Sequence, residues 1–277
     1  MPQPHLMALQ RRVLAGLLDA VPPHEAALGF VRGRSLRQHA QHHSGQALII
    51  KFDLQDFFGS VSAARVHAIF ATLGYHHEVA RALTALCTTA APEPWLQRWR
   101  ADGQLGWQQG QRLRSAHLPQ GAPTSPALAN LAAFRLDLRL AALAEAFGAR
   151  YSRYADDLAF SGETTLREHL PRLRVAVASI VAAEGFSLNT AKTRVSGAVR
   201  RQQVCGVVVN RHPNLPREDF DRLKAQLHDC VKRGPAAANR AAHADWRAHL
   251  RGQLAWAQQL NPGKVQRLMR LWDQIAW

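Results

Sequence analysis

The stretch Tyr154-Ala155-Asp156-Asp157 decides the fold of this chain, because apolar residues flank its two acids on both sides. Over residues 151–161 this pattern predicts two short strands joined by a hairpin turn that presents both carboxylates. An isolated Asp-Asp pair is most often a solvated turn. Whether this pair is a functional site or an ordinary turn therefore depends on the other motifs of the chain.

A third acid, Asp53, ends the segment 47–53, which is apolar except for Lys51 and rich in isoleucine. This composition predicts a buried strand with an acid at its tip. A sheet that pairs this strand with the hairpin would bring three carboxylates to one edge. Such acids repel one another unless cations lie between them, and hard oxygen ligands suit Mg²⁺. Two Mg²⁺ ions can hold the attacking and leaving oxygens of a phosphoryl transfer, as in polymerases and nucleases.

The 277-residue chain carries 35 Lys and Arg against 20 Asp and Glu, which leaves a net charge of +15. This excess favours a polyanionic partner and makes a small neutral metabolite a poor fit. The three cysteines, Cys87, Cys205 and Cys230, form no C-x-x-C pair. We therefore expect a reducing, cytoplasmic location with neither a disulfide framework nor a cysteine zinc site. No segment approaches the roughly 20 apolar residues of a membrane span, so no membrane partner is expected.

Helical spacing of apolar residues recurs along the chain. The expected helices cover about residues 6–18, 63–73 with Ser62 as the N-cap, 79–90, 127–147, 165–184, 220–231, 246–260 and 265–275. Residues 92–117, where tryptophans stand among Arg, Gln and Gly, are expected to form an irregular insertion or hairpin, and residues 204–209 a strand. The pattern predicts an α+β body over residues 1–210 and a basic helical domain over 211–277.

Three motifs stand in order along the chain: Phe52-Asp53-Leu54-Gln55-Asp56-Phe57-Phe58, Leu118-Pro119-Gln120-Gly121 and Tyr154-Ala155-Asp156-Asp157. In order, spacing and neighbouring residues they resemble the palm of reverse transcriptases, and the resemblance covers most of the chain, from about Val13 to Ile275. It implies a right-hand polymerase fold with short fingers, a palm with an antiparallel sheet and a helical, RNA-binding thumb.

Within that family the chain is similar to bacterial retron reverse transcriptases. The segment Arg34-Ser35 with residues 39–43 resembles the retron Asn-Ala-x-x-His box, although His39 stands where Asn is expected. Val204-Cys205-Gly206 resembles the Val-Thr-Gly box, with Cys205 in place of Thr, and residues 252–262 resemble the thumb motif shared with intron enzymes. The resemblance implies a structured non-coding RNA as template and primer, a branched RNA-DNA product, deoxynucleotide substrates, an effector protein as partner, and a role in anti-phage defence.

The resemblance also implies roles for individual residues. Asp53, Asp156 and Asp157 would hold two Mg²⁺ ions, for which Mn²⁺ can substitute, and Lys192 would protonate the leaving pyrophosphate. The residues implied in nucleotide binding are Arg32, Arg34, Phe58, Gln120 and Gly121, with Phe58 leaving no room for a 2′-hydroxyl. Those implied in primer and template binding are Tyr154, Gly206 and Asn210.

Other interpretations stay open. Phe58 can simply pack in the core, Lys192 can be an ordinary exposed lysine, and Asp56 can cap the turn after the strand. The chain can belong to another bacterial defence or intron-type reverse transcriptase, or be a non-catalytic, maturase-like RNA-binding scaffold. A pure scaffold has no physical need for three mutually repelling acids. A metal-dependent nuclease also uses such acids, but it would not explain Phe58 and the Pro-Gln-Gly turn.

Overall fold

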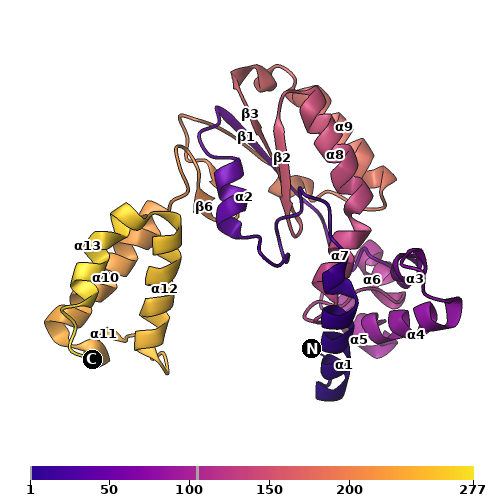
Figure 1. The fold of residues 1–277 in the computed structure, drawn as a ribbon, viewed down its shortest axis with the longest axis horizontal. Helices are drawn as coiled ribbons and strands as arrows, with labels where there is room; N and C mark the ends of the chain where they lie inside the picture. Colours follow the sequence, from indigo (N-terminus) through magenta and orange to yellow (C-terminus); the bar gives the residue numbers. More distant parts are fainter. Residues whose placement is uncertain (1, 104–105) are drawn as a thin grey trace. The chain divides into compact units, whose positions relative to one another are not determined.

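The computed structural model describes residues 2–103 and 106–277 and divides into two compact units (Figure 1). The first unit comprises Met1–Leu36 and Leu48–Val195, and the second comprises Arg37–Ala47 and Ser196–Trp277. The second unit resumes at Ser196, before the boundary at residue 210 that the sequence predicts, and it also includes the N-terminal segment Arg37–Ala47.

The first unit is built around the strands β2, β3 and β1, of which β3 pairs antiparallel with both others. The strand order of the sheet is β2-β3-β1-β4. The strands are β1 (Leu48–Asp53), β2 (Arg150–Tyr154), β3 (Asp157–Gly162) and β4 (Arg194–Gly197). The predicted hairpin and the predicted buried strand are thus confirmed, and they pair with Asp53 opposite Asp157. Ile49, Ile50 and Phe52 of β1 are buried, which explains why this segment is apolar on both faces.

Helices form much of the rest of the first unit. They are α1 (Pro4–Gly16), α3 (Ala63–Thr72), α4 (His77–Cys87), α7 (Ser125–Ala132), α8 (Phe134–Ala146) and α9 (Leu170–Ala183), with short 3₁₀ turns η1 (Leu18–Ala20), η2 (Thr164–Arg167) and η3 (Thr190–Lys192). Ser62 caps α3 as predicted, since its side chain accepts a hydrogen bond from the Arg65 amide. In Figure 1, α8 and α9 lie side by side next to β2 and β3.

The single long helix expected over residues 127–147 is wrong, because the chain breaks at Ala133 into α7 and α8. Arg65 Nη2 donates a 2.7 Å hydrogen bond to the Ala132 carbonyl oxygen. A side chain from α3 thus provides a hydrogen-bond donor for a carbonyl oxygen at the C-terminal end of α7. Residues 127–147 contain no glycine or proline that would predict this break, and Arg65 lies 67 positions away in the sequence.

The irregular structure expected over residues 92–117 is also wrong. This insertion forms two helices, α5 (Glu93–Ala101) and α6 (Trp107–Arg114). Trp95 and Trp99 are one helical turn apart, and their ring centroids lie 4.6 Å from each other. Leu96 is the buried residue of α5. One apolar turn among charged residues is too short a pattern for periodicity to reveal.

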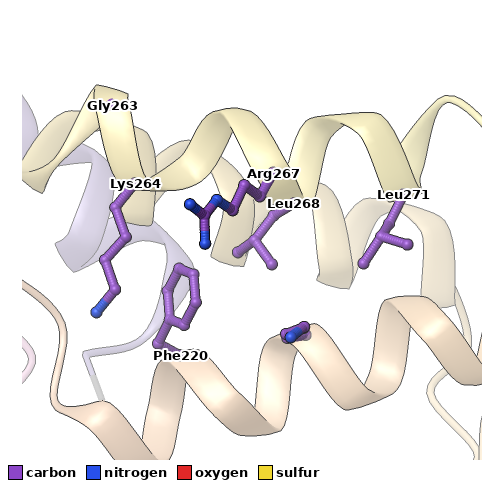
Figure 2. Close-up of a pocket in the computed structure, with 7 residues that line it drawn as sticks. Phe220, Gly263, Lys264, Arg267, Leu268 and Leu271 are labelled. Carbon is purple, nitrogen blue, oxygen red and sulfur yellow. The ribbon is translucent and has the colours of Figure 1, made fainter.

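The second unit contains α2 (Leu36–His42), a small hairpin and four helices. The strand expected over residues 204–209 is instead the hairpin β5 (Gln203–Val204) and β6 (Val207–Val208), because Cys205 and Gly206 turn the chain with positive φ angles of 46° and 81°. The helices are α10 (Arg217–Arg233), α11 (Pro235–Ala238), α12 (Trp246–Leu260) and α13 (Pro262–Trp272). Leu227, Leu250 and Leu268 are fully buried in the core that these helices share, and Figure 2 shows Leu268 of α13 directed toward α10.

No helix within residues 2–103 and 106–277 combines the length and the apolar character needed to cross a membrane.

Candidate active site

Backbone hydrogen bonds bring three separate segments together at one edge of the sheet. The Leu54 amide donates to the Asp156 carbonyl oxygen at 2.9 Å, which ties the end of β1 to the hairpin turn. The Asn189 amide donates to the Asp53 carbonyl oxygen at 2.8 Å, which brings the segment before η3 to the same place. Asp53, Asp156, Asp157 and Lys192 therefore share one site, although 139 positions separate Asp53 from Lys192.

Lys192 and Asp53 form an ion pair within this site. Lys192 Nζ lies 3.1 Å from Asp53 Oδ2, with the lysine side chain 62% exposed and the aspartate side chain 11% exposed. The hydrogen bond to Asp53, and then the charge of that carboxylate, raise the pKa of Lys192. The ammonium group thus stays protonated at neutral pH and reaches solvent, so it can offer a proton to a group bound at this edge.

The electrostatics of Asp156 show that the three acids act on one another. Partial burial raises the pKa of Asp156, and the negative charges of Asp157 and Asp53 raise it further. A cation between the carboxylates would relieve this repulsion, and carboxylate oxygens are the donors that Mg²⁺ prefers. Within the described residues, no group of three or more His, Cys, Asp or Glu is already arranged around a metal position. Asp53 Oδ2 is engaged by Lys192 instead.

Backbone hydrogen bonds link the segment 26–29 to the end of β2, just before the turn that carries Asp156. The Arg153 amide donates to the Ala26 carbonyl at 2.7 Å, and the Leu28 amide donates to the Arg153 carbonyl at 2.7 Å. Ala155 adopts a left-handed conformation, with φ of 56°. Gly29 packs so closely that a Cβ atom there would lie 2.6 Å from the Ala155 nitrogen. Only glycine permits this approach of one backbone to the other.

A buried polar network supports the same turn. Arg153 is fully buried and donates to both carboxylate oxygens of Asp137, at 2.8 and 2.6 Å. Arg153 Nη1 also donates to Asn130 Oδ1 at 2.9 Å and to the Ala155 carbonyl at 3.0 Å. Tyr151 donates its hydroxyl to Asp137 Oδ1, and burial raises the pKa of this phenol. The residue that precedes Asp156 is thus held by a charged side chain with no exposure to water.

Sequence reasoning missed this network, although a signal was available. Asp137 shares the buried face of α8 with Leu140 and Ala144, at helical spacing. An aspartate on such a face needs a cationic partner. The sequence does not reveal which of many arginines this partner is.

The Phe30 ring lies near the rings of both Phe58 and Tyr154. The Phe30 ring centroid lies 6.1 Å from that of Phe58 and 6.2 Å from that of Tyr154. Phe30 adopts a positive φ of 61° and is 51% exposed. Phe58 also contacts Phe57, whose exposure is only 4%, with centroids 5.5 Å apart. Phe58 is therefore half-buried between the core and an exposed aromatic residue that the sequence did not single out.

Gln120 is exposed, and it lines a cavity of about 550 Å³ together with Asp56, Trp95, Trp99 and Arg112. Asp56 Oδ1 accepts a 2.9 Å hydrogen bond from Gln109 Nε2 of α6, so the insertion is attached to the loop after β1. Asp56 has a positive φ of 50°.

The other residues expected to bind nucleotide lie on loops. Gly121 has a φ of 85°, which favours glycine. Arg32 is exposed. Arg34 Nη1 donates to the carbonyl oxygens of His24, Glu25 and Ala27, so this guanidinium organises its own loop.

Gly206 and Asn210 belong to the second unit. Gly206 occupies the turn of the β5-β6 hairpin. The Asn210 side chain accepts from the Gln202 amide at 3.0 Å and donates to the carbonyl oxygens of Ala198 and Arg200. These hydrogen bonds link Asn210, which follows the β5-β6 hairpin, to residues 198–202, which precede it.

The chain is similar to known proteins over most of its length. The family described as reverse transcriptase (RNA-dependent DNA polymerase) matches residues 5–209. The retron Mx65 reverse transcriptase of Myxococcus xanthus is 42% identical and covers 97% of this chain, and the retron Mx162 enzyme of the same organism is 36% identical and covers 95%. The retron Ec86 reverse transcriptase of Escherichia coli is 32% identical over 82% of the chain.

The chain spans 59% and 55% of the length of the two Myxococcus relatives. The family match confirms the predicted α+β, right-hand polymerase fold class. This chain belongs to the reverse transcriptase family and is similar, over nearly its whole length, to the retron members of that family.

Proposed function

We propose that the protein is an RNA-directed DNA polymerase, in which a primer hydroxyl attacks the α-phosphate of a deoxynucleotide and pyrophosphate leaves. The observation that carries this proposal is the meeting of Asp53, Asp156, Asp157 and Lys192 at one edge of the sheet in a chain of this family. Three mutually repelling carboxylates beside one exposed ammonium suit a site that handles phosphate and cations.

Asp53, Asp156 and Asp157 would hold two Mg²⁺ ions, which neutralise the charge that develops on the reacting phosphate oxygens. Mn²⁺ would substitute. Lys192 would protonate the leaving pyrophosphate, because its ammonium reaches solvent and stays charged at neutral pH. The Asp53 carboxylate holds that ammonium in place until substrate arrives.

The remaining proposed roles rest on the family to which the chain belongs. Phe58 would exclude a 2′-hydroxyl from the sugar site. Gln120, Gly121, Arg32 and Arg34 would contact the nucleotide. Tyr154, Gly206 and Asn210 would contact primer and template, and the helices after residue 210 would bind RNA.

The similarity to retron enzymes supports a narrower proposal. The template and primer would be a dedicated structured RNA, and the product a DNA branched from that RNA. An effector protein and anti-phage defence belong to the same proposal. So does a cytoplasmic location, since the chain has only three cysteines and no C-x-x-C pair.

A primed-template assay tests the polymerase activity. Purified protein is incubated with an RNA template, a DNA primer, deoxynucleotides and Mg²⁺ or Mn²⁺, and primer extension is measured. Extension by the wild type and its loss in Asp156→Asn are expected. Asp273→Asn, at an exposed position in the second unit, makes the same chemical change at an acid that has no proposed role in metal binding, and this variant should extend the primer normally. Tight RNA binding without extension would favour the scaffold interpretation.

A second experiment tests the retron type. The protein is expressed with its flanking genomic DNA, and the nucleic acid that copurifies is analysed before and after RNase and debranching treatment. A small DNA joined to RNA, absent from the Asp156→Asn preparation, is expected. Only unbranched DNA made from the native RNA would contradict the retron proposal while leaving the polymerase proposal intact.

A further inference from the structure

Phe30 is an exposed aromatic residue whose backbone has an unfavourable conformation. Its φ angle of 61° lies in the left-handed region, which a bulky side chain seldom adopts, and the residue is 51% exposed. Neither feature stabilises the fold, because a strained backbone costs free energy and a half-exposed ring gains less from burial than a core residue does. This combination indicates that the position of the ring serves a function.

Hydrogen bonds hold the loop on both sides of Phe30. Before it, the carbonyl oxygen of Gly29 accepts a 2.9 Å hydrogen bond from Nδ2 of Asn130, a buried residue of α7. After it, the carbonyl oxygen of Val31 accepts a 3.0 Å hydrogen bond from the Arg34 amide. Because the flanking backbone is held in this way, the loop keeps the Phe30 ring in a defined place although the ring itself is exposed.

The rings that Phe30 approaches belong to two other motifs. Its ring centroid lies 6.1 Å from that of Phe58, with 49° between the planes, and 6.2 Å from that of Tyr154, with 42° between the planes. At these separations aromatic pairs attract each other. Phe58 also contacts Phe57, which is only 4% exposed. Phe58 therefore has one aromatic neighbour in the core and another, Phe30, at the surface.

We propose that Phe30 is a second determinant of sugar selectivity, which acts by holding the Phe58 ring in the sugar site. Phe58 excludes a 2′-hydroxyl only while its ring stays there, and the Phe30 ring occupies space into which Phe58 would otherwise turn. Tyr154, at the end of β2, provides the second contact of the Phe30 ring. The inference rests on the proposed function, because it takes Phe58 as the residue that contacts the sugar. Phe30 is thus a positioning residue.

The test measures how each variant of the full chain chooses between deoxynucleotides and ribonucleotides. Single-nucleotide primer extension gives kcat/KM for a deoxynucleotide and for the ribonucleotide with the same base, and the ratio of the two values is the selectivity. Phe30→Ala and Phe58→Ala each remove one ring. Phe134→Ala is the matched control, because Phe134 is 41% exposed and its ring contacts that of His24. Thermal unfolding verifies that the variants fold.

The selectivity should fall roughly threefold to tenfold in Phe30→Ala, because the variant loses one aromatic pair contact that holds Phe58. The fall should come from a higher kcat/KM for the ribonucleotide. A purely structural defect would instead lower both values of kcat/KM together and leave their ratio unchanged. Phe134→Ala should keep the wild-type selectivity. The same selectivity in Phe30→Ala as in this control would overturn the proposal.

A double variant shows whether Phe30 acts through Phe58. If it does, Phe30→Ala/Phe58→Ala should have the selectivity of Phe58→Ala alone, because the ring that Phe30 holds is already absent. Effects that multiply in the double variant would overturn the positioning role, since Phe30 would then act on the nucleotide by itself.

Phe30→Gly separates the ring from the backbone. Glycine adopts a φ of 61° without strain, so this variant removes the ring and leaves the loop free to keep its conformation. Its selectivity should match that of Phe30→Ala. Wild-type selectivity in Phe30→Gly would overturn the proposal, because strain in the alanine variant would then explain its loss.

The same measurements distinguish a failure of this proposal from a failure of the proposed function. If the wild type extends no primer, the polymerase proposal falls and the role of Phe30 falls with it. If Phe58→Ala leaves the selectivity unchanged, neither residue determines the choice of sugar. If the wild type extends primer and Phe58→Ala accepts ribonucleotides while Phe30→Ala does not, only the proposal about Phe30 is overturned.

Discussion

Arg153 and Asp137 form an ion pair in which neither side chain has any exposure to water, with Nη2 2.6 Å from Oδ2. The same guanidinium donates to the carbonyl of Ala155, the residue before Asp156. A buried ion pair is thus hydrogen-bonded to the backbone of the turn that presents two of the three acids. The shape of this turn consequently depends on α8, which supplies Asp137.

Breaking this pair should strongly destabilise the protein. Asp137→Asn leaves Arg153 buried without a compensating charge, and we expect the free energy of unfolding to fall by about 3–5 kcal/mol in urea denaturation. Asp219→Asn removes one carboxylate of an ion pair with Arg222 on the exposed face of α10, and it should cost less than about 1 kcal/mol. Similar losses in free energy of unfolding in the two variants would show that breaking the buried pair costs no more than breaking an exposed one.

Gly29→Ala should impair catalysis by displacing the acidic turn. The new Cβ would lie 2.6 Å from the Ala155 nitrogen, so one of the two backbones has to move. A displacement of about 1 Å in a catalytic group can cost roughly 10²-fold in rate. We expect a loss of this order in primer extension under saturating deoxynucleotide.

Gly16→Ala is the matched control for this substitution. Gly16 is the last residue of α1, and beyond the backbone of that helix and the chain neighbours no atom lies within 4 Å of the position that a Cβ would take there. Alanine at this position should raise stability by up to about 1 kcal/mol without loss of extension. Normal extension by Gly29→Ala would mean that the turn tolerates the displacement.

Lys192 should matter for rate far more than for stability. Lys192→Gln should slow primer extension by roughly 10²- to 10⁴-fold if the ammonium acts as the general acid. Unfolding in urea should hardly change, because the side chain is 62% exposed and water screens its pair with Asp53.

Lys192→Arg separates the two possible roles of this residue. Arginine keeps the positive charge beside Asp53 but does not release its proton, so the rate should stay low although the ion pair is restored. Lys232→Gln, an exposed lysine on α10, is the control for loss of charge and should extend primer at the wild-type rate. Recovery of the rate by Lys192→Arg would show that Lys192 acts through its charge alone.

His39 should make the protein sensitive to acid. Burial, and secondly the charge of the neighbouring His42, lower the pKa of His39 from 6.5 to about 3. The unfolded chain therefore binds a proton below about pH 6.5 that the folded chain does not bind until near pH 3. Stability contributed by the neutral imidazole is complete above that window and is lost as pH falls through it, by up to about 1.4 kcal/mol per pH unit.

Urea denaturation at about pH 7 and about pH 5 measures this effect. His39→Asn, which installs the residue expected in the retron box, should make the loss of stability between the two pH values smaller than in the wild type. His228→Asn, at an exposed position of α10, should leave the loss unchanged. The same loss in wild type and His39→Asn would exclude His39 as its source.

Local patterns in the sequence predicted much of the fold. The apolar run that ends at Asp53, the strands around Asp156 and the Ser62 cap are all present in the structure. Each depends on residues within a few positions of one another, where alternation, capping and turn chemistry act directly. The α5-α6 insertion and the β5-β6 hairpin escaped prediction because their patterns are too short or depend on a positive φ at Cys205.

The sequence by itself determined which residue types stand at the sheet edge: three acids at the ends of strands, a lysine after a turn, and a basic helical C-terminal region. Only the tertiary structure decided which groups meet. Lys192 pairs with Asp53, Arg153 pairs with Asp137, and Gly29 lies against Ala155. The physical reason is that ion pairs and close backbone contacts depend on distance in space. One chain with 35 Lys and Arg offers many pairings, of which packing permits few.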